Sequence, residues 1–183
     1  MLWRQPDTTK DKKIDAAAAF TRGVRAHRNG NLKEALDAYD SAIQASDDPP
    51  ASYFHNRGGA LAVLGDNEQA LASFRQAVNI DPKHSGALKN LGAILVKQRG
   101  HEAEAAQIFE RILDLDRAPN SRSVAHAIFA YRNHAAVLAP EDACKVLEKA
   151  AELSAGRDEH AEVLPGGGNA RGCREGRNPN NYP

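Results

Sequence analysis

The chain has 183 residues, and its 24 lysine and arginine residues balance 24 aspartate and glutamate residues. A net charge of zero removes the usual electrostatic basis for binding nucleic acid or an anionic membrane. Only 10 residues are aromatic whereas 33 are alanine, which favours closely packed helices over a sheet. Because the chain has no apolar run of about 18 residues and no secretory-signal layout at its start, we expect a cytosolic or nuclear location and take the protein as cytoplasmic.

An internal repeat dominates the sequence after residues 1–13, which we expect to be disordered. Glycine and aromatic residues recur at a spacing of 34 to 35 residues: Gly23, Gly58 and Gly92 form one series, and Tyr39, Phe74 and Phe109 the other. Periods of this length predict stacked helical hairpins. A glycine in the middle of a helix costs up to about 1 kcal/mol, so its recurrence indicates a close approach of a neighbouring helix.

Each repeat predicts the same pair of helices. The first helix ends at a glycine turn, at Gly30, Gly65 and Gly100 in succession, where glycine supplies a left-handed C-cap. The second helix has small and aromatic residues on one face, as in Ala35, Tyr39 and Ala42, at spacings of a helical core stripe. Prolines close the hairpins because they cannot continue a helix.

The second repeat carries the most complete motif, with Gly58-x-x-Leu61, Gly65, Ala70-Leu71, Phe74, Ala77 and Pro82. It resembles the signature of the tetratricopeptide repeat, and the resemblance extends over residues 16–50, 51–84 and 85–118. It implies an all-α fold, a right-handed α-solenoid of antiparallel helix hairpins. After Pro119 the pattern decays, and residues 121–153 are expected to form a degenerate fourth hairpin that covers the last apolar face. The repeat domain is thus expected to span residues 14–155.

The last segment, residues 156–183, differs in composition. It holds six of the 14 glycines and three of the nine prolines, and we expect it to be disordered because it cannot bury enough apolar surface to fold. Three roles stay open for it: a functional tail, an autoinhibitory tail that folds back into the binding groove, and an alternative terminus without function.

The resemblance implies a binding groove lined by the first helix of each repeat. The groove residues singled out on this basis are Phe20, Val24, His27, His55, Asn56, Lys89, Asn90 and Lys97. Asn56 and Asn90 occupy matching positions in successive repeats, and a side-chain amide offers both a donor and an acceptor to a peptide backbone. The alternative is that the two amides only bridge or cap helices. Basic residues without an acid among them favour a neutral to acidic segment.

Family members that bind chaperone tails hold the terminal carboxylate with a five-residue clamp of lysine, asparagine and arginine. At the clamp positions this chain has Phe20, Val24, Asn56, Gly86 and Asn90. Only Asn56 matches, and no positive charge remains to hold a carboxylate. We therefore expect no strong binding to chaperone tails, although Lys89 lies close to one clamp position.

Catalytic and metal-binding motifs are missing from the sequence. It has no phosphate-binding glycine loop and no nucleophile motif, and Cys144 and Cys173 are not spaced as metal ligands. We read both cysteines as free thiols, Cys144 buried. The leading hypothesis is a non-enzymatic adaptor, without a cofactor or metal, that binds a peptide segment of a protein partner in its groove. A self-associating structural module that forms homo-oligomers is the alternative, and an enzyme with an unrecognised site is a weaker third.

Overall fold

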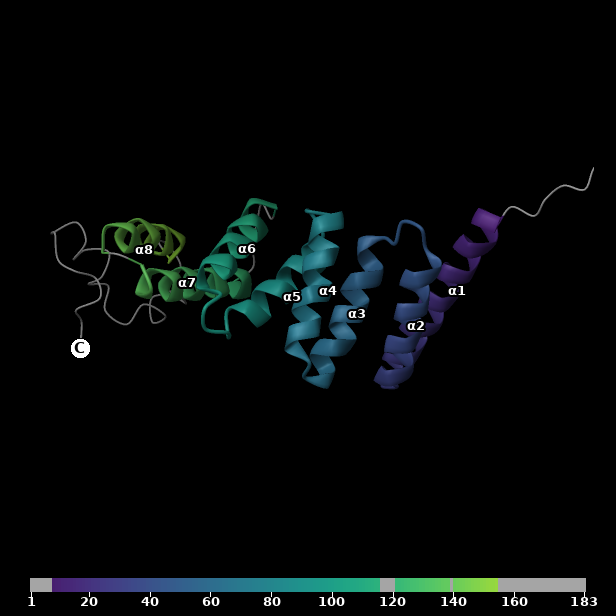
Figure 1. Cartoon of the computed structure of the whole chain (residues 1–183). Helices are drawn as coiled ribbons and strands as arrows, with labels where there is room; N and C mark the ends of the chain where they lie inside the picture. Colours follow the sequence, from purple (N-terminus) through teal and green to yellow (C-terminus); the bar gives the residue numbers. More distant parts are fainter. Residues whose placement is uncertain (1–7, 116–120, 139, 155–183) are drawn as a thin grey trace, which may run out of the picture. The chain divides into compact units, whose positions relative to one another are not determined.

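The computed structural model describes residues 8–115, 121–138 and 140–154, and within these ranges the chain forms eight α-helices and no strand. In chain order (Figure 1) the helices are α1 (Thr8–Arg28), α2 (Leu32–Ala45), α3 (Ala51–Leu64), α4 (Asn67–Ile80), α5 (Ser85–Leu95), α6 (Glu102–Leu115), α7 (Ser121–Ala136) and α8 (Pro140–Ser154). The chain divides into two compact units, Met1–Asn90 and Leu91–Pro183, and each is described by itself.

The first hairpin of the first unit packs α1 against α2. The predicted core stripe of α2 is confirmed, since Ala35, Tyr39 and Ala42 are all 0% exposed. The turn between the helices depends on Gly30, whose φ of 81° lies in the left-handed region that glycine adopts without strain. Gly65 and Gly100 have the same conformation (φ 85° and 88°), so the three predicted glycine turns are confirmed.

The second hairpin packs α3 against α4, and the contact is closest at Gly58. A Cβ atom at Gly58 would lie 2.8 Å from Cε1 of Phe74, whose ring is fully buried. Glycine is therefore present in the middle of α3 because no larger residue leaves room for the aromatic ring. The predicted reason for the repeated glycine, a close helix approach, is confirmed here.

The amino-terminal boundary differs from the expectation. Residues 1–13 were expected to be disordered, but α1 begins at Thr8, so residues 8–13 are helical and that part of the prediction was wrong. The sequence over residues 8–13 is polar and lacks the repeat motif, which is why it was not assigned to the first helix. Residues 1–7 and the predicted tail, residues 156–183, lie outside the described part of the chain.

The second unit contains the carboxyl-terminal residues of α5 and the helices α6 to α8. The apolar faces of the two helices in the expected fourth hairpin are buried; the residues are Val124, Ala127, Ile128 and Tyr131 in α7, and Ala143, Leu147 and Ala150 in α8. The pKa of Tyr131 is raised to about 12 by burial and by the nearby carboxylates of Glu110 and Asp114. Nζ of Lys149 in α8 donates a hydrogen bond to Oε1 of Glu110 in α6, at 2.6 Å.

Cys144 in α8 departs from its predicted state. The sequence predicted a free, buried thiol, whereas Cys144 is disulfide-bonded in the structure and half-buried. The prediction rested on the small number of cysteines and on their spacing in the sequence. Neither feature shows which residues lie close together in the folded chain. Cys173 lies outside the described residues.

Candidate functional site

Seven of the eight predicted groove residues fall in the first unit, on α1, α3 and the start of α5. The eighth, Lys97, belongs to the second unit and is exposed in the turn that follows α5. Lys89 and Asn90 are exposed, and the other five side chains are half-buried. The predicted residues on α1 and α3 thus combine contacts to the core with access to solvent.

Phe20 and Val24 are the two apolar residues among the predicted groove residues. The Phe20 ring stacks on the ring of Tyr53 in α3, with centroids 4.4 Å apart and planes 19° apart, and it lies 5.7 Å from the ring of Tyr39. Val24 packs against the buried cluster that contains Ala26 and Tyr39. Both side chains therefore fix α1 against the neighbouring helices, and only their remaining surface is available to a ligand.

His27 is held at the junction of three helices. Its Nδ1 lies 3.4 Å from the hydroxyl of Tyr39 in α2, and the two rings meet edge to face with centroids 6.4 Å apart. A Cβ atom at Gly59 in α3 would lie 3.7 Å from Cε1 of His27. Burial raises the pKa of Tyr39, so its hydroxyl keeps its proton at neutral pH; this hydroxyl can donate or accept, and the tautomer of His27 sets the direction of the bond.

His55 and Asn90 form the most specific polar contact among the predicted residues. Nδ2 of Asn90 lies 3.2 Å from Nε2 of His55, and because an amide nitrogen only donates, the imidazole nitrogen accepts. The ring of His84 lies 4.8 Å from the ring of His55. Burial first, and the charge of His84 second, lower the pKa of His55 below its ordinary value of 6.5. His55 is therefore neutral at physiological pH.

Gly86 and His84 complete the surroundings of His55. A Cβ atom at Gly86 would lie 3.2 Å from Cε1 and Nε2 of His55, so the missing side chain leaves room for the imidazole. Nδ1 of His84 accepts a hydrogen bond from the backbone N–H of Ala87 at 3.1 Å, which satisfies one of the free donors at the start of α5. Sequence reasoning missed His84, since its position in the turn between helices gave no signal.

Asn56 makes a local contact instead of a contact to the next repeat. Its Nδ2 donates to the backbone carbonyl of Ser52, one turn earlier in α3, at 2.8 Å. This bond lies within α3, so it neither bridges two helices nor caps one. It uses one amide donor, and no donor to Oδ1 of Asn56 is found within the described ranges.

Arg57 was also missed by sequence reasoning. Its Nε donates to Oδ1 of Asp40 in α2 at 2.6 Å, and its Nη1 donates to Oγ of Ser73 in α4 at 2.7 Å. The guanidinium group therefore joins the first hairpin to the second. The repeat period offered a signal, because Arg22 lies 35 residues earlier.

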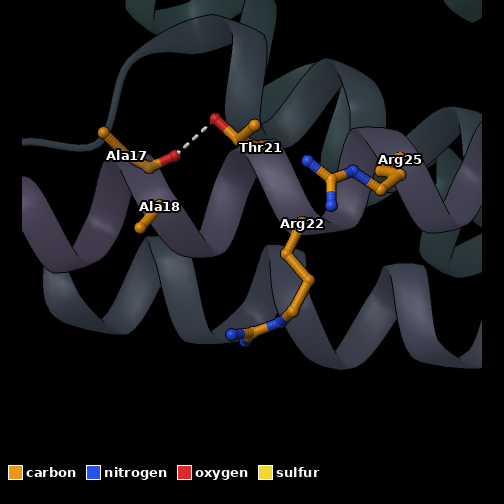
Figure 2. Close-up of a pocket in the computed structure, with 5 residues that line it drawn as sticks. All are labelled: Ala17, Ala18, Thr21, Arg22 and Arg25. Atoms are coloured by element: carbon orange, nitrogen blue, oxygen red, sulfur yellow. Dashed lines mark hydrogen bonds between the residues drawn. The ribbon is translucent and has the colours of Figure 1, made fainter.

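An open hollow of about 540 Å³ lies along one side of α1, lined by Ala17, Ala18, Thr21, Arg22 and Arg25 (Figure 2). Oγ1 of Thr21 donates to the backbone carbonyl of Ala17 at 2.8 Å. The side chains of Arg22 and Arg25 leave the helix in different directions (Figure 2). Neither arginine was among the predicted groove residues.

Metal-binding clusters and membrane-spanning helices are both missing from the described ranges. Within them, no group of three or more histidine, cysteine, aspartate or glutamate residues is arranged to hold a metal ion. None of the helices in these ranges combines the length and the apolar character that crossing a membrane requires.

The structure is that of a helical-repeat protein. Left-handed glycine turns join the paired helices, and the first helices carry half-exposed polar residues. Two tetratricopeptide repeat family models match the chain, one over residues 8–50 and the other over residues 64–127. The chain belongs to the tetratricopeptide repeat family. Both the resemblance and the fold class predicted from the sequence are confirmed.

Curated relatives include two cyanobacterial assembly proteins. Photosystem I assembly protein Ycf3 from Acaryochloris marina is 35% identical over 111 residues, which cover 58% of this chain and 67% of the relative. The protein of the same name from Rippkaea orientalis is 32% identical over 108 residues, covering 55% of this chain and 62% of the relative. The chain thus spans 62% to 67% of the length of these two relatives.

Solved structures share the fold. YrrB, described as a TPR protein with an unusual peptide-binding site, has a TM-score of 0.61 at 23% identity, over 81% of this chain and 75% of that one. The TPR domain of Arabidopsis OM64 has a TM-score of 0.58 at 24% identity, over 67% and 98%. The first TPR domain of Spaghetti (RPAP3), bound to the HSP90 peptide SRMEEVD, has a TM-score of 0.56 at 22% identity, over 67% and 98%.

Proposed function

We propose that the chain is a non-enzymatic adaptor that binds an extended segment of a partner protein along α1, α3 and the first residues of α5. The observation that carries this proposal is the state of the two amides. Asn56 and Asn90 are each fixed by one internal hydrogen bond, and each retains a carbonyl oxygen and a second N–H for a ligand. An extended backbone presents donors and acceptors that match such amides.

The charge of the same residues defines the partner segment. Lys89 is exposed beside Asn90, no acid is among the seven groove residues of the first unit, and His55 is neutral. A segment that is neutral to acidic is therefore preferred over a basic one. The exposed parts of Phe20 and Val24 add an apolar contact for one side chain of the segment.

The relatives support the same class of function. Those named as photosystem I assembly proteins are said by their names to assist the assembly of a protein complex. We propose that this chain likewise holds a protein segment during assembly of a complex, acts in the cytoplasm, and needs no cofactor.

The test replaces Asn56 and Asn90 by alanine and uses the replacement of another asparagine as a matched control. Partner proteins are captured with the purified chain, and crosslinking mass spectrometry locates the contacts. Asn56→Ala combined with Asn90→Ala is expected to reduce capture at least about tenfold, whereas Asn79→Ala, an exposed amide on α4, is expected to leave it unchanged. Circular dichroism melts should be similar for all three proteins.

Two results would contradict the proposal. One is full capture by the double variant with an unchanged melt, which would show that the amides are not at the binding surface. The other is a set of crosslinks restricted to the second helices α2 and α4, which would place the partner on the opposite surface of the hairpins.

A further inference from the structure

The side of α3 that faces the first hairpin forms the contact between the first and second repeats. Tyr53 and Ala60 are buried against residues of the first hairpin, Tyr53 in the cluster with Ala42 and Ala60 in the cluster with Tyr39. Between them, Arg57 pairs with Asp40 of α2. The contact between repeats thus consists of an arginine that pairs with an aspartate, with an aromatic residue on one side of the arginine and a small residue on the other.

Within the described part of the chain, the same side of α1 has no such neighbour. A shift of 35 residues places Ala18, Arg22 and Arg25 where α3 has Tyr53, Arg57 and Ala60. These three residues of α1 are exposed and line the hollow in Figure 2. No ion pair of Arg22 or Arg25 is found within the described ranges.

The last described helix carries a matching acid. In α2, Asp40 follows Tyr39, the aromatic residue of the stripe Ala35, Tyr39 and Ala42. In α8, Glu148 follows Leu147 in the corresponding stripe, which consists of Ala143, Leu147 and Ala150. Both stripes are buried, so the two acids occupy the same angular position on their helices. Glu148 is exposed, and Glu152 lies one turn further along the same helix.

We infer that the α1 side bearing Ala18, Arg22 and Arg25 binds the Glu148 side of α8 from a second copy of the chain. In this contact Arg22 meets Glu148 as Arg57 meets Asp40. The choice of a second copy rests on this charge complementarity and on the repeated geometry of the two stripes. The contact is separate from the amides of the proposed binding surface.

The interface is heterologous because the two copies use different surfaces. One copy contributes the arginine side of α1, and the other contributes the Glu148 side of α8. Ala18 buries less apolar surface than Tyr53 does at the equivalent contact, which makes the contact weaker than the internal one. Self-association is therefore expected to depend on protein concentration over the micromolar range and on salt.

Charge reversal gives a sharp test, with sedimentation velocity of the full chain as the readout. Arg22→Glu and Glu148→Arg are each expected to weaken self-association at least about tenfold. A mixture of the two variants is expected to associate, because wild-type Arg22 on one variant meets wild-type Glu148 on the other. The double variant Arg22→Glu/Glu148→Arg is expected to associate again by itself.

Matched controls separate the contact from a general effect of charge. Lys33→Glu on α2 and Glu68→Arg on α4 change the net charge by the same amounts at exposed positions and are expected to associate as the native chain does. The Asn56→Ala/Asn90→Ala protein should also associate normally, so failure of the groove proposal leaves this test intact. A native chain that stays monomeric up to about 1 mM, or a variant mixture that stays monomeric, would overturn the inference.

Discussion

Arg57 of α3 donates a hydrogen bond of 2.6 Å to Asp40 of α2, and its second branch donates to the buried hydroxyl of Ser73 in α4. One guanidinium group thereby connects three helices from two repeats. Its planar fork is suited to two acceptors in fixed directions, which a lysine would not satisfy. The two hairpins of the first unit depend on this side chain as well as on apolar contacts.

Removing either partner should have unequal effects. Asp40→Ala is expected to lower the free energy of unfolding by about 0.5 to 1 kcal/mol, since the Asp40 side chain is 44% exposed and solvent weakens the pair. Arg57→Ala is expected to cost about 2 kcal/mol because the Ser73 hydroxyl also loses a donor. Urea denaturation measures both, with Asp37→Ala on the same helix as a control. Equal losses in all three variants would contradict this assignment.

Neighbouring glycines in α3 should respond in opposite ways to alanine. Gly58→Ala places a methyl group 2.8 Å from the Phe74 ring and is expected to destabilise the fold by about 1 to 3 kcal/mol through overpacking. Gly59→Ala meets only Cε1 of His27 at 3.7 Å and is expected to stabilise by about 0.5 to 1 kcal/mol through helix propensity. Thermal melts distinguish the two, and a stabilised Gly58→Ala protein would show that the ring moves freely.

The stability of the protein is expected to decrease in mild acid because of His55. The folded state lowers the pKa of His55 below 6.5 through burial and the nearby His84, so the unfolded chain binds more protons. The free energy of unfolding therefore falls as the pH decreases through about 6.5. Urea titrations between about pH 7.5 and 5.5 test this. His55→Gln should flatten the dependence, and an unchanged slope in that variant would rule out His55 as its source.

A chaperone tail should not bind strongly. The peptide SRMEEVD, to which the first TPR domain of Spaghetti is bound, ends in a carboxylate, and the clamp positions here have Phe20, Gly86 and Asn90 in place of the charged residues. Fluorescence anisotropy is expected to show no saturation below about 100 μM. Micromolar binding that is lost in Lys89→Ala, and kept in Lys33→Ala, would contradict this prediction.

Much of the local structure was predictable because it depends on neighbouring residues. The turn at Gly65 needs a left-handed residue, and the stripe of Ala35 and Tyr39 needs only helical periodicity, so both could be read from the sequence. The contact between His55 and Asn90 was not predictable in detail. The repeat period placed the two residues on one surface, but the direction of each side chain depends on tertiary contacts that the period does not contain.

The sequence alone determined the repeat period, the helical hairpins and the family, because each of these follows from patterns of glycine, alanine and aromatic residues within 35 positions. Only the tertiary structure decided which polar groups are used internally. It assigned one donor of Asn56 to Ser52, assigned Arg57 to Asp40 and Ser73, and left Arg22 exposed at the equivalent position on α1. The physical reason is that hydrogen bonds and ion pairs depend on distances of a few ångströms between helices, and a linear pattern does not contain these distances.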